Sequence, residues 1–196
     1  RLCYPTGGSY RSPYIFADLD GDENEEAVVF YTVEDEPLIY LQILDKTEGR
    51  WRAGNALPGT DGKVLYVDFR HLSDDGVTDL LVGWRSADAE SDTLYLYRFR
   101  NGTLSEEFHV SCDGMAIADF NGDGADELIA ATLDGGVTLQ LIGRGSSGIS
   151  VLDSAYSSLR MQSLLGSVAG MIAPQQPGAA FYGRVNADMT ASLLVG

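Results

Sequence analysis

The chain has 196 residues, of which 44% are apolar and 21% are charged, and its formal net charge at pH 7 is −16. A chain of this length can bury a substantial hydrophobic core. The negative charge repels phosphate backbones and anionic lipids, so nucleic acid and a bare membrane surface are poor partners, and no stretch approaches the ~20 apolar residues that insert across a bilayer.

Short apolar runs rich in β-branched and aromatic residues, each bounded by Gly, Asp, Asn or Pro, predict β-strands along the chain. They include residues 27–31, 38–44 and 93–99. Turn sequences separate such runs at Lys46–Gly49, Asn101-Gly102 and Asp134–Gly136. Asn-Gly predicts a type I′ hairpin turn, because that turn requires positive φ at both central residues. Only Ser154–Leu165 has a helical pattern, weakened by its serines, so the sequence predicts an all-β protein.

An internal repeat of roughly 50 residues organises these strands. Acidic loops begin at Asp18 and Asp119, a weaker copy spans His71–Asp79, and Pro177–Tyr182 echoes Glu26–Tyr31 without the acids. About four short strands in such a unit match one propeller blade. We therefore expect one repeat domain over 1–196, a partial β-propeller of about three to four four-stranded blades, the last incomplete, at 10–58, 62–111, 113–154 and 160–196. Because closed propellers generally need more blades, we expect a fragment of a longer propeller or an open array completed by another copy.

The first and third loops carry oxygen-bearing side chains at alternate positions. Positions 1, 3, 5 and 9 are Asp18, Asp20, Asp22 and Glu26 in the first loop, and Asp119, Asn121, Asp123 and Glu127 in the third. Alternate side chains of a tightly curled loop converge on one point, and the backbone carbonyl at position 7, from Asn24 or Ala125, turns inward. Calcium takes about six to eight oxygen ligands. The sequence therefore predicts a calcium site in each of these two loops.

The alternative is that these acids only form Asx-turns on a soluble surface, since Asp and Gly are ordinary turn residues. Two nine-residue matches in equivalent repeat positions favour the metal. Neither loop is an EF-hand, because position 12 falls inside an apolar strand rather than being a bidentate Glu. Glu23 stands where the third loop has Gly124, and a left-handed conformation there would cost the first loop on the order of 1 kcal/mol.

The second loop has lost part of the pattern. Its positions 1, 3, 5 and 9 are His71, Ser73, Asp75 and Asp79, and imidazole is a poor ligand for a hard cation. We expect this loop to hold no calcium, with its acids accepting hydrogen bonds from backbone N–H groups instead.

The segments DLDGDENEEAVVFY and DFNGDGADELIAAT, each preceded by a short apolar strand, resemble FG-GAP/VCBS repeats, which form β-propeller blades in integrin α-subunits and many bacterial secreted proteins. The resemblance covers most of residues 10–145 and is specific at the first and third loops. The run YPTGGSYRSPYIFADLDGDENEEAVVFY is similar to uncharacterised VCBS-type lipoproteins of Gram-positive bacteria. The resemblance implies an extracellular or cell-envelope setting and no defined ligand. It also implies calcium at Asp18, Asp20, Asp22, Asn24, Glu26, Asp119, Asn121, Asp123, Ala125 and Glu127.

Three functional classes remain. We expect first a binding or adhesion module that recognises a protein or a glycan without catalysis. The alternatives are part of a carbohydrate-active enzyme of the polysaccharide-lyase type and a purely structural envelope scaffold. Trp51, Trp84 and Tyr97 would stack on sugars if exposed, but core packing explains them equally well. No general acid–base pair stands out, which counts against an enzyme, and self-association through an open sheet edge is compatible with all three classes.

Other motifs have plainer explanations. Gly143–Gly148 satisfies GxGxxG, but a dinucleotide site needs that motif between a strand and a helix, with an acid about 20 residues later. Position 163 is serine, so we expect a flexible turn. His71 and His109 are expected at the surface or at a pocket edge. Cys3 and Cys112 permit one disulfide, and buried free thiols are the default expectation.

Overall fold

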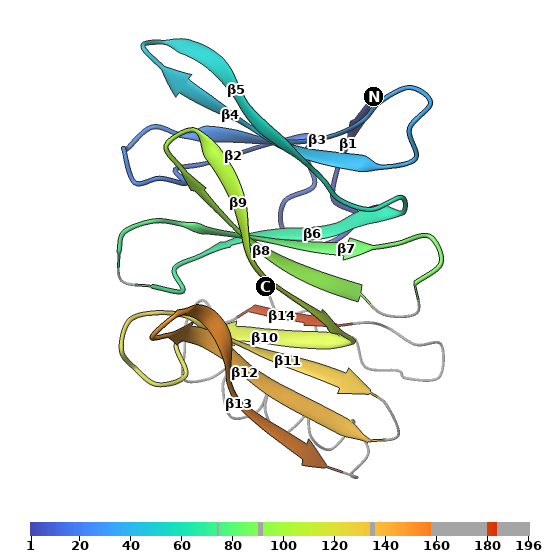
Figure 1. Cartoon of the computed structure of the whole chain (residues 1–196), viewed down its shortest axis with the longest axis vertical. Helices are drawn as coiled ribbons and strands as arrows, with labels where there is room; N and C mark the ends of the chain where they lie inside the picture. The colour runs from blue at the N-terminus through green and yellow to red at the C-terminus, as the bar shows by residue number, and fades with distance from the viewer. Residues whose placement is uncertain (74, 90–91, 134–135, 158–179, 184–196) are drawn as a thin grey trace. The chain divides into compact units, whose positions relative to one another are not determined.

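A computed structural model of the chain describes residues 1–73, 75–89, 92–133, 136–157 and 180–183 (Figure 1). These residues form strands and turns, which confirms the all-β prediction. None of them belongs to a helix long and apolar enough to cross a membrane. The chain divides into two compact units, residues 1–110 and 111–196, each described by itself below.

The first unit contains two antiparallel sheets. In the first sheet β3 pairs with β4 and β4 with β5, while β1 and β2 pair with successive parts of β3. The second sheet has the order β6-β7-β8-β9. The strands are β1 (Leu2–Cys3), β2 (Tyr14–Ala17), β3 (Glu26–Thr32), β4 (Ile39–Thr47), β5 (Arg50–Pro58), β6 (Lys63–Arg70), β7 (Asp79–Arg85), β8 (Asp92–Arg100) and β9 (Thr103–Cys112).

Two hairpin turns of the first unit have the backbone that their sequences predict. Between β8 and β9, Asn101 and Gly102 have φ of 51° and 73°. Between β4 and β5, Glu48 and Gly49 have φ of 52° and 73°. Positive φ at both central residues matches the right-handed twist of the flanking strands. The third predicted turn, Asp134–Gly136, lies partly outside the described residues.

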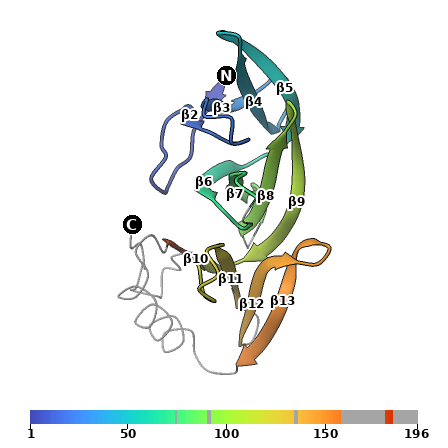
Figure 2. The ribbon, with the colours of Figure 1, turned by 90° about the vertical axis from the view of Figure 1, so that its left-hand side faces the viewer.

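The two sheets of the first unit pack face to face around one hydrophobic core (Figure 2). Phe30 of β3 meets Trp84 of β7 edge to face, with ring centroids 5.6 Å apart. Alternate residues of each strand point into this core, because successive side chains of a strand lie on opposite faces of its sheet. The core residues are Ile15, Leu19, Val28, Phe30, Ile39, Leu41, Ile43, Val64, Val67, Leu80, Val82, Trp84, Tyr97, Phe99 and Leu104.

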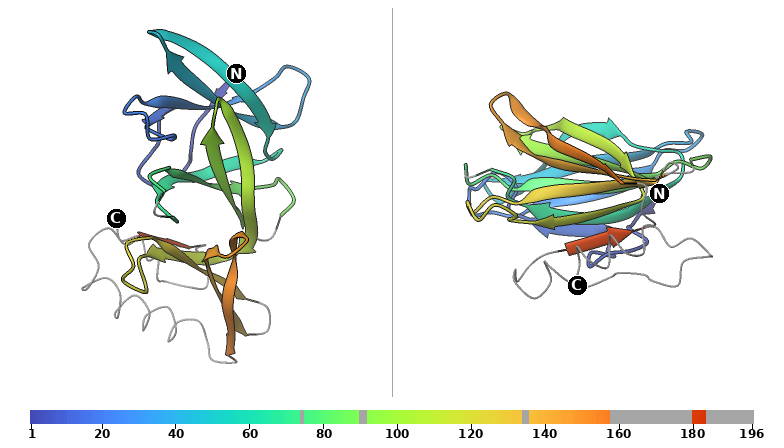
Figure 3. Two further views of the ribbon diagram at one scale, coloured as in Figure 1. Left: turned by 60° about the vertical axis from the view of Figure 1, so that its left-hand side comes forward. Right: turned by 90° about the horizontal axis from the view of Figure 1, so that it is seen from below.

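The second unit contains the third sheet, in the order β13-β12-β11-β10-β14 (Figure 3). Its strands are β10 (Gly114–Ala118), β11 (Glu127–Leu133), β12 (Val137–Gly145), β13 (Gly148–Ser157) and β14 (Ala180–Gly183). The GxGxxG sequence is the hairpin between β12 and β13, as expected. Residues 154–157 belong to β13, so the helical pattern predicted from Ser154 is wrong there, because cross-strand pairing with β12 extends through them. The rest of that pattern, and most of 160–196, lies outside the described residues.

Candidate metal-binding loops

The three acidic loops occupy the same place in their sheets, since they join β2 to β3, β6 to β7 and β10 to β11. In each, the carboxylate at position 9 accepts a hydrogen bond from the backbone N–H at position 2. The N–O distances are 2.7 Å for Leu19 to Glu26, 2.8 Å for Leu72 to Asp79 and 2.9 Å for Phe120 to Glu127. Position 9 is thus fixed at the start of its strand with its carboxylate turned back into the loop.

The first and third loops also share the way their first aspartate closes the curl. The Asp18 carboxylate accepts hydrogen bonds from the N–H groups of Gly21 (2.8 Å) and Glu23 (3.0 Å). The Asp119 carboxylate accepts them from Gly122 (2.6 Å) and Gly124 (3.0 Å). The two loops therefore have one backbone scaffold and differ in the side chains that it carries.

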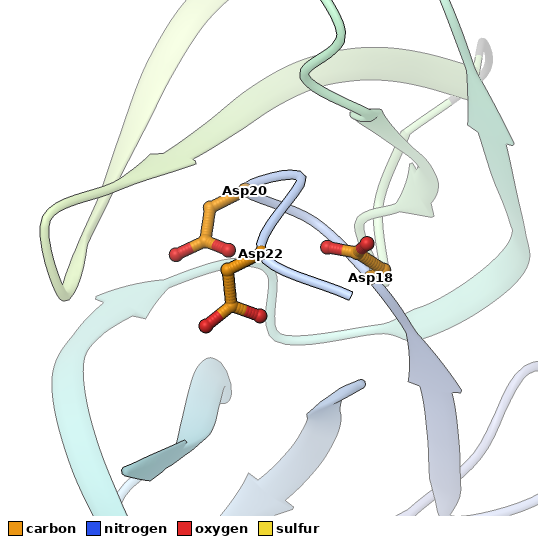
Figure 4. Close-up of side chains that lie close together, drawn as sticks. All are labelled: Asp18, Asp20 and Asp22. Atoms are coloured by element: carbon orange, nitrogen blue, oxygen red, sulfur yellow. The ribbon is translucent and has the colours of Figure 1, made fainter. Parts of the chain in front are cut away.

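In the first loop the acids gather with few partners. Oxygens of Asp18, Asp20 and Asp22 lie within 4.8 Å of one another (Figure 4). Glu26 is fully buried, and while its Oε2 binds the Leu19 N–H, no described residue hydrogen-bonds its Oε1. The buried Oδ1 of Asp20 has no described partner either. Buried polar atoms normally have hydrogen-bond partners, so these two oxygens are acceptors that a proton, a water or a cation could satisfy.

Electrostatics in the first loop reflect this crowding of acids. Burial, followed by the charges of Asp20, Asp22 and Asp18, raises the pKa of Glu26 to about 7, against the effect of the Leu19 hydrogen bond. Burial and the Asp22 charge likewise raise the pKa of Asp20. A nearby positive charge would relieve both effects.

In the third loop a neutral donor binds the second oxygen of the position-9 glutamate, which has no described partner in the first loop. The Asn121 side-chain amide donates to Glu127 Oε1 at 2.7 Å and to Asp123 Oδ2 at 2.9 Å. Burial still raises the pKa of Glu127, but its second oxygen is satisfied. Glu127 and Asp123 therefore have a donor within the third loop, and the Asn121 Oδ1 accepts the Asp123 N–H at 2.8 Å.

In the second loop the chain supplies its own cation. The Arg98 guanidinium, 3% exposed, donates from Nε to Asp79 Oδ1 at 2.7 Å and from Nη1 to Asp75 Oδ2 at 2.9 Å, and its Nη2 bonds Ser73 Oγ. These three residues fill positions 3, 5 and 9. Arg100 also binds Asp75 from the solvent side. The predicted backbone contact exists, from the Val77 N–H to Asp75 at 3.3 Å, but Arg98 is the main partner, which sequence reasoning missed.

The first and second loops lie against each other. The Thr78 N–H donates to the Leu19 carbonyl at 3.2 Å. A groove with a cavity volume of about 370 Å³ runs beside this contact. Its lining is Asp20, Gly21, Asp22, Asp75, Val77, Arg100 and Asn101. Two of the first-loop acids therefore face an open space that a solute can enter.

Glu23 has the left-handed backbone that the sequence predicts, with φ of 69°, where Gly124 has 94°. We expect Glu23→Gly to raise the free energy of unfolding by about 0.5–1 kcal/mol, because glycine removes the strain at positive φ. Chemical denaturation measures the change. The exposed neighbour Glu25→Gly, whose φ is not positive, should instead destabilise the chain, and a loss of stability in Glu23→Gly would contradict the assignment.

The remaining predicted residues fall into a buried group and an exposed group. Trp84 and Tyr97 are each 2% exposed and belong to the core, so they do not stack on sugars. Trp51 is 48% exposed, beside Phe16 at a ring distance of 6.1 Å and under the Lys46 ammonium. His71 and His109 lie at the surface, as expected. The two cysteines form no disulfide; Cys112 is buried as expected, whereas Cys3 is only half-buried.

The comparisons with known proteins add no identity to this geometry. No protein-family model matches the chain, and a search of curated proteins finds no match.

Proposed function

We propose that the chain is a calcium-stabilised part of an FG-GAP/VCBS-type β-propeller. In this proposal the first and third loops bind calcium through Asp18, Asp20, Asp22, Asn24 and Glu26, and through Asp119, Asn121, Asp123, Ala125 and Glu127. The module acts outside the cell or on its envelope, binds a protein or a glycan, and catalyses no reaction. Calcium fixes each loop against its strands, so that its role is structural.

The observation that carries the calcium proposal is the comparison of the first loop with the second. Oxygens at positions 3, 5 and 9 surround a guanidinium cation in the second loop. The first loop has Asp20, Asp22 and Glu26 at these positions, and two of its buried oxygens have no described partner. Carboxylate oxygens are the ligands that calcium prefers. The first loop has the corresponding oxygens but no arginine among them, and this favours a cation from solution.

Calcium is expected to raise the melting temperature of the chain above its value in chelator. A site with Kd of ~10⁻⁴ M in ~1 mM calcium adds about 1.4 kcal/mol, which corresponds to roughly 3 °C or more for a chain of this size. Differential scanning calorimetry in calcium and in EDTA measures the shift, with magnesium as the matched ion. An equal melting temperature in calcium and EDTA would refute the calcium sites.

We also expect a pH dependence in the metal-free chain. The folded chain holds the Glu26 proton more tightly than the unfolded chain, so this contribution to stability is complete below pH 4.5 and is lost as the pH rises to about 7. Its size is on the order of 3 kcal/mol. The measurement is the difference in unfolding free energy between the wild type and Glu26→Gln in EDTA at each pH. A difference that stays constant from pH 4.5 to 8 would be evidence against it.

The propeller assignment is supported by the two unlike faces of the first sheet. The residues of the second sheet that pack against the first sheet are Leu80, Val82 and Trp84. When the loops are aligned, the corresponding positions of the first sheet are Ala27, Val29 and Tyr31. Those three residues lie on the opposite face of the first sheet, beside Tyr14 and Phe16, because side chains alternate along a strand. A further sheet of the same kind fits that face, as stacked blades require.

Tyr14, Phe16 and Trp51 on that face are each 48% exposed, so the face has room either for a further sheet or for a bound protein or glycan, and the binding role takes the second case. Exposed aromatic surface is characteristic of binding sites. A glycan array separates the partners: glycan binding that is lost in Trp51→Ala supports a lectin-like module. Turnover of an acidic polysaccharide would instead support the enzyme alternative.

A further inference from the structure

One strand position stands opposite the ninth residue of each loop. In the second sheet, Asp79 of β7 pairs with Arg98 of β8. In the first sheet, Ala27 of β3 pairs with Leu44 of β4, and because the strands are antiparallel the preceding residue Glu26 lies opposite the following residue Asp45. In the third sheet, the pair Leu128 and Ile142 places Gly143 opposite Glu127. We call Asp45, Arg98 and Gly143 the facing positions of the three loops.

The facing position of the second loop supplies a cation to the loop. Arg98 reaches over its pair partner Asp79 to Asp75 and Ser73, and its side chain is only 4% exposed. Asp79 is fully buried and is one methylene shorter than the glutamate of the other loops. The shorter side chain leaves room for the guanidinium between the loop and the strand. The second loop therefore needs no ion from solution to satisfy its buried acids.

The facing position of the first loop does the reverse. Asp45 brings a further negative charge to the strand position opposite Glu26. Its carboxylate accepts a hydrogen bond from the Thr47 hydroxyl at 3.1 Å, so it sits on the sheet as a fixed acid. No cation can reach Glu26 from this strand position. The buried Oε1 of Glu26, which has no described partner, is therefore left to a proton or to a cation from solution.

The facing position of the third loop is a glycine with little room for a side chain. A Cβ added to Gly143 would lie 3.0 Å from Glu127 Cγ and 3.0 Å from Leu152 Cδ1. A long basic residue would therefore displace Glu127 from its place. The third loop keeps its acid at position 9 and receives no cation from the strand.

From these three cases we infer that the facing position determines which loops take a divalent cation. Arginine there closes a loop with the chain's own guanidinium, whereas aspartate or glycine leaves the loop to an external ion. Asp45 and Gly143 thus select the first and third loops for the metal, and Arg98 selects the second against it. The inference rests on the calcium sites proposed above, and it assigns the selection to residues outside the loops.

The test transfers the second-loop pair to the first loop. Asp45→Arg combined with Glu26→Asp should lower the number of calcium ions bound per chain by one, measured by isothermal titration calorimetry. In EDTA the double variant should melt about 3 °C or more above Glu26→Asp alone, because the new guanidinium pairs with the loop acids. Glu26→Asp is the matched control, and it should keep its calcium with a weaker Kd. If the double variant does not fold, calcium stoichiometry and the melting temperature in EDTA are measured on Asp45→Arg alone.

The outcomes separate this inference from the proposed function. A wild-type chain that binds no calcium would overturn the proposed sites and the inference with them. A wild type that binds calcium, beside Asp45→Arg variants that bind the same number of ions and melt no higher in EDTA than their controls, would overturn the inference alone. Loss of one ion together with the higher melting temperature in EDTA supports it.

Discussion

Arg98→Met is expected to lower the free energy of unfolding by about 3–5 kcal/mol, because it breaks a buried ion pair. Methionine fills much of the same volume but leaves Asp79, which is fully buried, without its cationic partner. A buried carboxylate that loses its described cationic partner must either stay ionised at high cost or take up a proton. Urea denaturation measures the loss.

Two further variants decide whether the loss comes from the unpaired charge. Arg100→Met removes a guanidinium that is 50% exposed and that binds Asp75 among the described residues of this loop, so it should cost less than about 1 kcal/mol. Adding Asp79→Leu to Arg98→Met removes the stranded acid and should restore part of the stability. If Arg98→Met lowers the free energy of unfolding as little as Arg100→Met does, the Arg98 guanidinium does not stabilise the second loop.

Glu26→Gln is expected to weaken calcium binding at the first loop by roughly 100-fold, or about 2.7 kcal/mol, because the loop loses its buried charged ligand. In EDTA at pH 7 the same variant should be more stable than the wild type. The glutamine oxygen can still accept from the Leu19 N–H, and its amide can donate to Asp20 Oδ1, as Asn121 donates to Glu127 in the third loop. The change thus has opposite signs with and without calcium.

Calcium titrations by calorimetry and melting curves in EDTA measure the two effects of Glu26→Gln. The matched control is Glu25→Gln, an exposed neighbour that changes the net charge equally and should alter neither quantity by much. A similar loss of affinity in both variants would mean that general charge, rather than the buried ligand, attracts the ion. Unchanged calcium affinity in Glu26→Gln would remove the first loop from the proposed sites.

Much of this protein follows from local sequence. Alternating apolar residues predicted the strands, Asn101-Gly102 predicted a turn with positive φ, and the spacing of acids predicted loops of one shape. The strain at Glu23 was also predictable, because it follows from the match with Gly124. These features depend on backbone preferences and on neighbours a few residues away, which the sequence states directly. The helical pattern from Ser154 was wrong, because strand pairing overrode a weak local preference.

Tertiary structure alone decided which groups contact the acids of each loop. Arg98 follows Asp79 by 19 residues, and only the register of β7 on β8 brings its guanidinium into the loop. An arginine inside the apolar run Tyr95–Phe99 was the one signal in the sequence. Burial likewise separated Trp84 from Trp51, which the sequence could not do. The acidic loops are thus predictable from the sequence, whereas the proposed binding of an external cation depends on the side chains that the folded sheets place opposite the loops.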